Sequence, residues 1–179
     1  MIKRNRVFIA SSLDGFIADK NGNIDWLHSI PNPNQDDMGY SDFMEDIDAI
    51  ILGRNTFETV CTFDIEWPYK KPVFVWSNSL KTIPEGLKEN VFLVKGSVDE
   101  IIKQVHEKGF YRLYIDGGKT IQSFLAEDQI DEITLTTIPI LLGSGKSLFS
   151  EIQKPLEFSC VASKIYLNEV VQNRYIRKR

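Results

Sequence analysis

Cysteine and histidine are both scarce in this chain, which contains two of each among its 179 residues. Cys61 and Cys160 lie far apart and form no Cys-x-x-Cys pair, so the sequence indicates neither a disulfide framework nor a thiolate metal site. His28 and His106 are likewise too widely separated to indicate a histidine metal site. We therefore expect no bound metal, and the sparse use of cysteine is typical of a protein from a reducing compartment.

The sequence also lacks an excess of positive charge and any long apolar run. Its formal net charge is -4, so no basic surface indicates nucleic acid as a partner, and we expect the basic residues 174–179 to be a solvated strand end. The first apolar run is interrupted at Ser11, Ser12 and Asp14, which fits neither a signal peptide nor a membrane span. We expect a cytoplasmic protein that contacts neither nucleic acid nor membranes.

Two common nucleotide-binding signatures are missing as well. Residues 143–147 read Gly-Ser-Gly-Lys-Ser, but a P-loop also needs a glycine at the position of Ile140. No Gly-x-Gly-x-x-Gly follows the first predicted strand, so an ordinary Rossmann fingerprint is absent. A nucleotide site in this chain must therefore be built from other residues.

What the sequence does contain is a regular alternation of strand and helix patterns. Ser97 opens a capping box, Asn55 has similar spacing to a later glutamate, and Ser41 is a candidate cap of a short helix. The pattern predicts one domain over residues 1–179, a three-layer α/β/α sandwich whose mainly parallel sheet ends in an antiparallel pair joined near Asn168. The predicted strands are 7–10, 48–53, 72–78, 91–94, 113–115, 132–138, 156–167 and 169–176.

Small or basic residues follow four of the predicted strands. In sheets of this kind, ligands bind beyond the carboxyl ends of the strands, and free N–H groups at a helix start suit a phosphate. The clusters therefore favour an elongated, phosphorylated ligand, although a plain tight turn is an equal reading of the glycine pair, and a capped helix beside a solvated arginine is the alternative at the first cluster. The four clusters are Gly53-Arg54, Ser77-Asn78, Lys95-Gly96 and Gly117-Gly118.

Four motifs, taken in order, resemble the dihydrofolate reductase-like superfamily, and most of all the C-terminal reductase domain of the riboflavin biosynthesis protein RibD. The ordered set is specific for the fold and much less so for the substrate. The motifs are Ser12-Leu13-Asp14-Gly15-x-Ile17-Ala18, Gly53-Arg54-Asn55-Thr56, Asp116-Gly117-Gly118 and Pro139-x-Leu141-Leu142-Gly143-x-Gly145-x-x-Leu148-Phe149.

The resemblance implies NADPH as the hydride donor. It assigns Lys95 to the 2′-phosphate, where a positive charge favours NADPH over NADH. It places Ala10 and Ile17 on either side of the nicotinamide, and the pyrophosphate on Gly117 and Gly118 with Lys119 and Thr120 nearby. It assigns the adenosine phosphates to Gly53, Arg54, Asn55, Thr56, Ser77 and Asn78.

The resemblance says less about the substrate side. It makes Asp14 the first candidate for substrate contact or proton handling, with Ser11 or water as other proton sources and an ordinary Asp-Gly turn as the alternative reading of Asp14. Trp26 and Phe57 are candidates for lining the substrate. Dihydrofolate reductases carry a carboxylate shortly after the matching tryptophan, whereas residues 27–31 contain no acid and the aspartates come later.

The sequence therefore predicts an NADPH-dependent reductase of a small heterocyclic substrate, similar to 5-amino-6-(5-phosphoribosylamino)uracil reductase. The alternatives are a dihydrofolate reductase-type pterin reductase, a dinucleotide-binding module without turnover, and a structural domain that binds no nucleotide. The resemblance also implies a homodimer, with core packing as an equal explanation of the apolar C-terminal residues Phe158, Val161, Ile165, Val170 and Val171.

Overall fold

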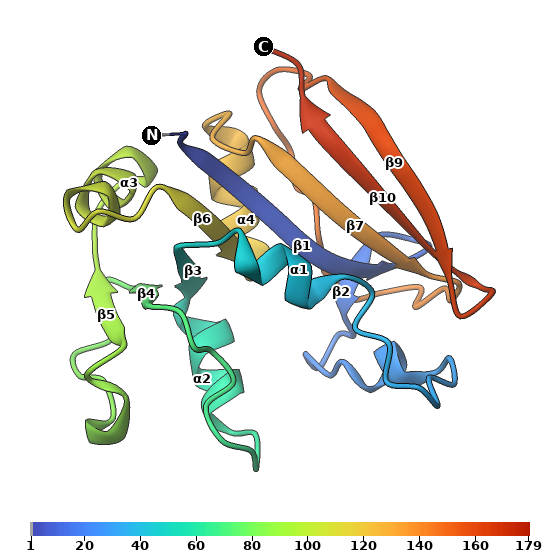
Figure 1. The fold of residues 1–179 in the computed structure, drawn as a ribbon, viewed down its shortest axis with the longest axis horizontal. Helices are drawn as coiled ribbons and strands as arrows, with labels where there is room; N and C mark the ends of the chain where they lie inside the picture. Colours follow the sequence, from blue (N-terminus) through green and yellow to red (C-terminus); the bar gives the residue numbers. More distant parts are fainter. Residues whose placement is uncertain (1) are drawn as a thin grey trace.

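The computed structural model describes residues 2–179, which form two sheets and six helical segments (Figure 1). The N-terminal half contains β1 (Arg4–Ser12), β2 (Phe16–Ala18), η1 (Asp25–His28), α1 (Tyr40–Glu45), β3 (Ala49–Gly53), α2 (Arg54–Cys61), β4 (Val73–Trp76) and η2 (Glu85–Leu87). The C-terminal half contains β5 (Val91–Val94), α3 (Val98–Glu107), β6 (Arg112–Asp116), α4 (Gly118–Ala126), β7 (Glu132–Ile138), β8 (Lys146–Ser147), β9 (Phe158–Tyr166) and β10 (Val170–Arg177).

The main sheet has eight strands in the order β5-β4-β3-β6-β1-β7-β10-β9. All neighbours from β5 to β7 are parallel, and β10 runs antiparallel to both β7 and β9. Leu167 and Asn168 adopt positive φ angles in the tight turn between the last two strands. The predicted parallel sheet with an antiparallel C-terminal pair is thus confirmed.

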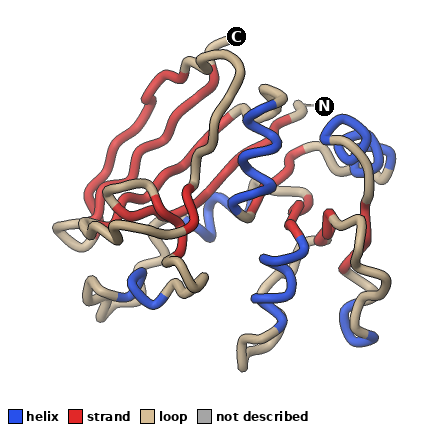
Figure 2. The backbone as a smooth tube through the Cα atoms, turned by 180° about the vertical axis from the view of Figure 1, so that it is seen from behind, coloured by secondary structure: helices blue, strands red, loops and turns tan. Residues whose placement is uncertain are grey.

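Helices cover both faces of this sheet, as the three-layer prediction requires (Figures 1 and 2). On one face, α3 and α4 pack buried side chains such as Ile101 and Phe124 against the strands. On the other face, Phe43 of α1 and Phe57 of α2 do the same. Among residues 2–179, no helix is both long enough and apolar enough to cross a lipid bilayer.

The helix starts differ in how their free backbone N–H groups are satisfied. The predicted capping box at Ser97 is confirmed, with both of its reciprocal hydrogen bonds present. The other two predictions were wrong: α1 begins at Tyr40, where the Asp37 carboxylate accepts the N–H of Ser41, and α2 follows Gly53 without a side-chain cap. The first N–H groups of α2 are therefore available to a ligand.

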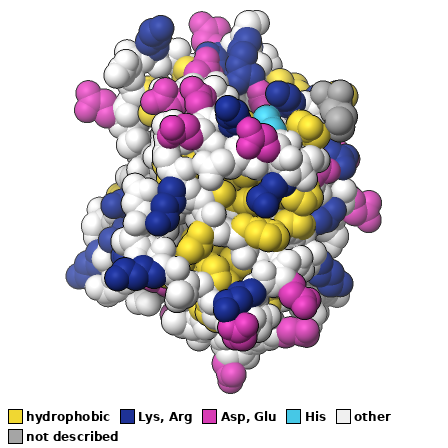
Figure 3. All heavy atoms as spheres, turned by 90° about the vertical axis from the view of Figure 1, so that its left-hand side faces the viewer, with side chains coloured by type: hydrophobic (Ala, Val, Ile, Leu, Met, Phe, Trp, Pro, Cys, Tyr) yellow, Lys and Arg dark blue, Asp and Glu magenta, His cyan; other side chains and the backbone are white. Residues whose placement is uncertain are grey.

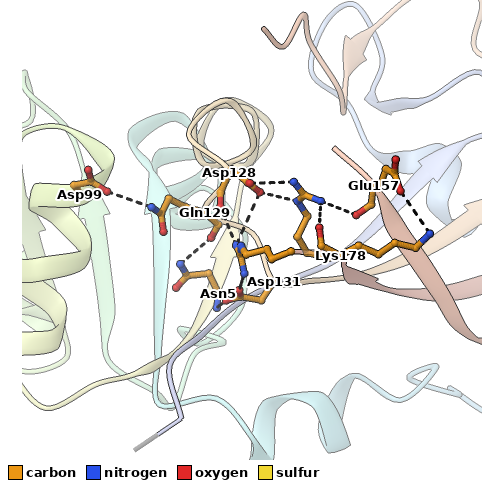
Figure 4. Close-up of polar contacts among 9 residues, drawn as sticks. Asn5, Asp99, Asp128, Gln129, Asp131, Glu157 and Lys178 are labelled. Carbon is orange, nitrogen blue, oxygen red and sulfur yellow. Dashed lines mark hydrogen bonds and ion pairs between the residues drawn. The ribbon is translucent and has the colours of Figure 1, made fainter. Parts of the chain in front are cut away.

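The basic C-terminal end is held by acidic partners, not merely solvated as predicted (Figure 4). Arg177 donates two hydrogen bonds to the Asp128 carboxylate, at 2.7 and 3.0 Å, and its side chain is largely buried. Arg179 pairs with Asp131, and the Lys178 ammonium lies 3.7 Å from a carboxylate oxygen of Glu157. These pairs fix the end of β10 beside the turn that precedes β7.

Candidate active site

The starts of α2 and α4 pack against each other where two neighbouring parallel strands, β3 and β6, end. A Cβ atom on Gly53 would lie only 2.8 Å from the Thr120 hydroxyl of α4, and a Cβ atom on Gly117 would collide with the Thr56 hydroxyl of α2. Neither helix has a side-chain cap, so both leave their first N–H groups free at the same edge of the sheet. Two adjacent helix starts with hydroxyls between them suit a ligand with more than one phosphate.

A cation and two serines extend this edge toward β4. The Arg54 guanidinium donates a hydrogen bond to the Ser79 hydroxyl at 2.8 Å and lies 3.6 Å from the Glu58 carboxylate. The buried Ser77 hydroxyl accepts the N–H groups of Ser79 and Leu80 and so shapes the turn after β4. Ser79, which was not predicted, hydrogen-bonds to both Arg54 and Ser77, two of the predicted cofactor residues.

The remaining predicted cofactor residues lie along the same edge. Asn55, Asn78 and Lys119 are exposed at or just after the ends of β3, β4 and β6. Lys95 is exposed where β5 ends, and its carbonyl accepts a hydrogen bond from Gln104 at 2.8 Å. The four sequence clusters thus share one edge, and the assignment of individual phosphate contacts stays a prediction.

Asp14 joins two loops at the rim of this edge. Its carboxylate accepts hydrogen bonds from the Ser12 hydroxyl at 2.6 Å and from the N–H groups of Leu142 and Gly143 at 3.1 and 2.7 Å. Principally because of the Ser12 hydrogen bond, the pKa of this exposed carboxyl lies below its usual value. Asp14 is therefore ionised near neutral pH and engaged in holding backbone, which fits a positioning role better than proton delivery.

The two joined loops press a side chain onto the start of α4. Short strands β2 and β8 pair in antiparallel fashion, and the N–H of Leu148 donates to the Gly15 carbonyl at 2.9 Å. Ile17, in β2, then packs so closely on Gly118 that a Cβ atom there would lie 2.6 Å from the Ile17 Cδ1. The predicted cofactor residues Ile17 and Gly118 are therefore in contact.

A cavity of about 250 Å³ opens on the α1 side of the sheet. Ala10, predicted to flank the nicotinamide, forms part of its wall, so the cavity adjoins the predicted cofactor edge. Most of its lining is apolar, which suits a flat heterocycle. The lining residues are Phe8, Ala10, Leu27, His28, Ile30, Asn32, Asp37, Met38, Thr136, Ile138, Leu167 and Val170.

Two polar groups of this cavity, Asp37 and Thr136, come from distant parts of the chain. Asp37 supplies a carboxylate whose pKa is lowered by hydrogen bonds from Ser41 and Gly39, so it is ionised. The buried Thr136 hydroxyl accepts a hydrogen bond from Gln172 at 2.9 Å. Asp37 lies beyond residues 27–31, the stretch in which the resemblance to dihydrofolate reductases places a carboxylate.

Asp116 is a second carboxyl group at the cofactor edge, and it is surrounded by tyrosines. Its carboxylate accepts the Gly117 N–H at 2.8 Å, and the nearby hydroxyls of Tyr114 and Tyr69 oppose the effect of burial on its pKa. Burial raises the pKa of Asp116 above its ordinary value, and burial likewise raises the pKa of Tyr40 to about 12. The Tyr114 hydroxyl donates to the Phe8 carbonyl at 3.0 Å, and Phe8 forms part of the cavity wall.

The three other predicted substrate-side residues lie away from open space. Ser11 and Phe57 are only 3% and 2% exposed, so neither presents a surface to a ligand in this conformation. Trp26 is half-buried in the cluster beneath the cavity, and its indole N–H has no hydrogen-bond partner among residues 2–179. Their predicted roles stay predictions, whereas Asp37 and Asp116 have positions that sequence inspection did not reveal.

Comparison with known proteins agrees with this geometry. The family model of the RibD C-terminal domain matches residues 6–172. A crystal structure of a putative riboflavin biosynthesis protein from Shewanella sp. PV-4 is 53% identical, with a TM-score of 0.95, covering 98% of this chain and 99% of that one.

Two more distant structures show the same fold. The Thermotoga maritima diaminohydroxyphosphoribosylaminopyrimidine deaminase/5-amino-6-(5-phosphoribosylamino)uracil reductase is 18% identical, with a TM-score of 0.73, over 98% of this chain and 57% of that one. Dihydrofolate reductase from Enterococcus faecalis, complexed with NADP(H) and RAB-propyl, is 19% identical, with a TM-score of 0.66, over 98% and 97%. The predicted dihydrofolate reductase-like fold is confirmed.

Proposed function

This chain belongs to the RibD C-terminal domain family, and we propose that it is an NADPH-dependent reductase of a small nitrogen-containing substrate. The observation that carries the proposal is the pair of uncapped helix starts, α2 and α4, packed together beside a cavity of about 250 Å³. The first feature suits a dinucleotide and the second a flat heterocycle. By resemblance to the Thermotoga enzyme, the proposed substrate class is a ribosylaminopyrimidine or a related imine.

The chain's own residues fit NADPH at this edge. The close approach of Gly53 to Thr120 and of Gly117 to Thr56 leaves no room for a side chain at either glycine, and it brings the two uncapped helix starts together. We assign the pyrophosphate to these helix starts, and the adenosine phosphates to Arg54, Ser77 and Ser79. When bound, NADPH supplies a hydride, that is, one proton with two electrons.

Reduction of a C=N bond needs a proton on nitrogen as well as a hydride on carbon. We assign that proton to Asp116, because burial raises its pKa and so favours the protonated form. After transfer, the Asp116 carboxylate takes up a proton again from water.

The joined loops contribute positioning. Asp14 holds residues 142 and 143 while Ile17 rests on Gly118, so the rim of the site is fixed to the start of α4. In the proposed complex this contact orients the nicotinamide and keeps water from its reactive face. Asp14 thereby acts through other residues, and the proton is assigned to Asp116.

A pterin reductase is the second candidate, because the cavity contains an ionised carboxylate, Asp37, together with the Thr136 hydroxyl. A carboxylate beside a hydroxyl can accept hydrogen bonds from the adjacent N–H groups of a pterin. The two candidates predict different effects of Asp37→Asn: a large loss with a dihydropterin, and a small one with a substrate whose recognition lies elsewhere.

The test is NADPH oxidation by the full chain against a panel of ribosylaminopyrimidines and dihydropterins. We expect turnover with at least one class, and loss of turnover in Asp116→Asn while NADPH binding is retained. Asp42→Asn, at an exposed position of α1, is the matched control and is expected to behave as wild type. NADPH binding without oxidation of any substrate would instead identify a dinucleotide-binding module without turnover.

A further inference from the structure

The cavity beside the cofactor edge is lined by a carboxylate and by no lysine or arginine. Its twelve lining residues, all in the described part of the chain, include Asp37, and His28 is the only one of them able to become positively charged. Asp37 is exposed as well as lining the cavity, which places its carboxylate at the cavity mouth. A ligand in this cavity therefore lies beside a negative charge.

The sequence accounts for this imbalance of charge. No lysine or arginine occurs in residues 21–53, a stretch that contains seven acidic residues. The same stretch supplies half of the cavity lining, so this part of the wall has no lysine or arginine of its own. The lining residues that it supplies are Leu27, His28, Ile30, Asn32, Asp37 and Met38.

The start of α1, next to this wall, is already occupied by an anion of the chain itself. The Asp37 carboxylate accepts the N–H groups of Gly39 and Ser41, each at 2.9 Å, and the Asp37 carbonyl accepts the N–H of Tyr40 at 3.0 Å. Free N–H groups at a helix start would suit a phosphate. Here these groups are taken by Asp37 and are not available to a ligand.

The neutral polar groups of the lining provide few hydrogen bonds for a phosphate. The Asn32 amide donates to the Asp36 carbonyl and accepts the Asp36 N–H, both at 2.8 Å. The Thr136 hydroxyl accepts a hydrogen bond from Gln172 and keeps a single hydrogen to donate. A phosphate presents three strong acceptor oxygens and a charge of about -1.5 to -2, which these groups do not satisfy.

Two arginines on this face of the sheet are engaged elsewhere. The Arg6 guanidinium lies 2.8 Å from the Glu132 carboxylate, and that of Arg174 lies 3.5 Å from the same group. Thr136, in the cavity wall, comes four residues after Glu132 on β7, which is roughly 13 Å along the strand. Both positive charges are therefore paired at the far end of the strand from the cavity.

Lys164 is a third cation on this face, and it does not line the cavity. It pairs in register with Gln172, which in turn donates to the Thr136 hydroxyl. The Lys164 ammonium lies 4.0 Å from the centre of the Tyr166 ring, where a cation–π contact stabilises it. Its charge is therefore directed to an aromatic ring of the chain and away from a ligand in the cavity.

The cofactor edge shows what this chain provides where phosphates are expected. Arg54, Lys95 and Lys119 are exposed at or just after the ends of β3, β5 and β6, beside the uncapped starts of α2 and α4. Lysine and arginine side chains also lie among acidic ones over the β5 side of the molecule (Figure 3). The cavity has neither feature, so the two parts of the site suit ligands of different charge.

We propose that the substrate of this reductase carries no phosphate, and that Asp37 selects a neutral or cationic nitrogen heterocycle by repelling anions and accepting N–H groups. The inference rests on the proposed function, because it concerns the substrate of the same site. It distinguishes this chain from the Thermotoga maritima enzyme, whose name specifies a phosphoribosylamino group. Of the two ligands of the reaction, only NADPH binds this chain through phosphates.

The test is titration calorimetry of the full chain, loaded with NADP⁺ so that no reduction occurs, with two ligands that differ by one phosphate. The pair is 5-amino-6-(5-phosphoribosylamino)uracil and the same compound without its phosphate. We expect the phosphate-free compound to bind about fivefold or more tightly, because a phosphate brings about two negative charges toward Asp37. This preference should shrink in 1 M salt, where the Debye length falls to about 3 Å.

Two variants locate the source of the preference. Asp37→Asn removes the charge but keeps an oxygen that accepts a backbone N–H at the start of α1, and it is expected to lower the preference by about twofold or more. Asp42→Asn removes the same charge from an exposed position of α1 that does not line the cavity, so it should leave the preference unchanged.

Three results would overturn the proposal: equal or tighter binding of the phosphorylated compound to the wild-type chain, binding of neither compound, or a preference that is unchanged in Asp37→Asn. Failure of NADP⁺ to bind would contradict the proposed function instead. The same titrations without NADP⁺ would then still compare the two ligands, so the two failures are distinguishable.

Discussion

The Asp14 carboxylate accepts the backbone N–H of Gly143 at 2.7 Å, across a sequence separation of 129 residues. The same carboxylate holds Leu142, so one exposed side chain fixes the loop before β2 to the loop before β8. Through this link Ile17 lies against Gly118 at the start of α4. Asp14, which the resemblance made the first candidate for proton handling, thus helps to position residues at the start of α4.

Replacing Asp14 is expected to loosen both loops without removing a group that takes part in the reaction. In Asp14→Ala we expect faster hydrogen exchange at the amides of Leu142 and Gly143 and a lower kcat/KM, with Asp14→Asn intermediate because its amide oxygen still accepts one hydrogen bond. Asp36→Ala, exposed and outside this pair of loops, is the control. Complete loss of turnover with unchanged exchange would contradict a positioning role.

The lowered pKa of Asp14 gives this link a definite pH dependence. A carboxyl whose pKa is lower in the folded state contributes while it is ionised, and loses that contribution as pH falls through the folded-state pKa. The protection factors of the Leu142 and Gly143 amides, which are corrected for the intrinsic pH dependence of exchange, should therefore stay high at neutral pH and fall only in acid. An equal dependence in Asp14→Asn would contradict the assignment to this carboxyl.

Gly53 tests the packing of the two helix starts. Gly53→Ala places a Cβ atom 2.8 Å from the Thr120 hydroxyl, so we expect NADPH affinity to fall by about tenfold or more as α4 is pushed away. Thr120→Ala in the same chain removes the obstructing hydroxyl and should restore part of the affinity. Gly86→Ala, which meets nothing within 4 Å, is the matched control. Titration calorimetry measures all four proteins.

Asp116 is expected to control the pH profile of turnover. Its folded-state pKa is raised, so the protonated donor is present below that pKa and is lost as pH rises through it. We expect kcat to fall on the alkaline side of that pKa, and the limb to disappear in Asp116→Asn. A limb that persists in Asp116→Asn would assign the proton to another group.

The buried ion pair between Arg6 and Glu132 is expected to matter for stability alone. The Arg6 guanidinium lies 2.8 Å from the Glu132 carboxylate, and both side chains are less than 10% exposed. Glu132→Gln leaves Arg6 with only the exposed Asp46 carboxylate as a charged partner and should cost about 3–5 kcal/mol in urea unfolding. Asp46→Asn removes a mostly exposed partner of the same arginine and should cost less than about 1 kcal/mol. Equal costs would contradict this account.

The fold and the cofactor edge were largely predictable from sequence because they depend on local patterns. Apolar runs, the Ser97 capping box and the glycines after β3 and β6 all act within a few residues, and parallel strands then bring their carboxyl ends to one edge. The α2 start was misread because Asn55 has capping-box spacing, whereas Gly53 already occupies the cap position.

The substrate side was less predictable because its contacts cross the chain. Asp37 reaches the cavity only through the path of the segment between η1 and α1, and Asp116 gains its environment from Tyr40 and Tyr69, which come from other elements. Neither of these arrangements produces a residue spacing that can be recognised in the sequence. Asp14 was predicted as a functional residue from its motif, but its partners 128 and 129 residues away lay beyond any local pattern.

The most direct test of the central claim is a thermal unfolding measurement with NADPH, with NADH alongside, on wild type and Arg54→Ala. A ligand at about a hundred times its Kd adds roughly 2.7 kcal/mol, which for a chain of this size raises the Tm by roughly 5 to 10 °C. We predict such a rise with NADPH in wild type, and most of it lost in Arg54→Ala. No rise with either dinucleotide would contradict the assignment of the paired helix starts to the cofactor.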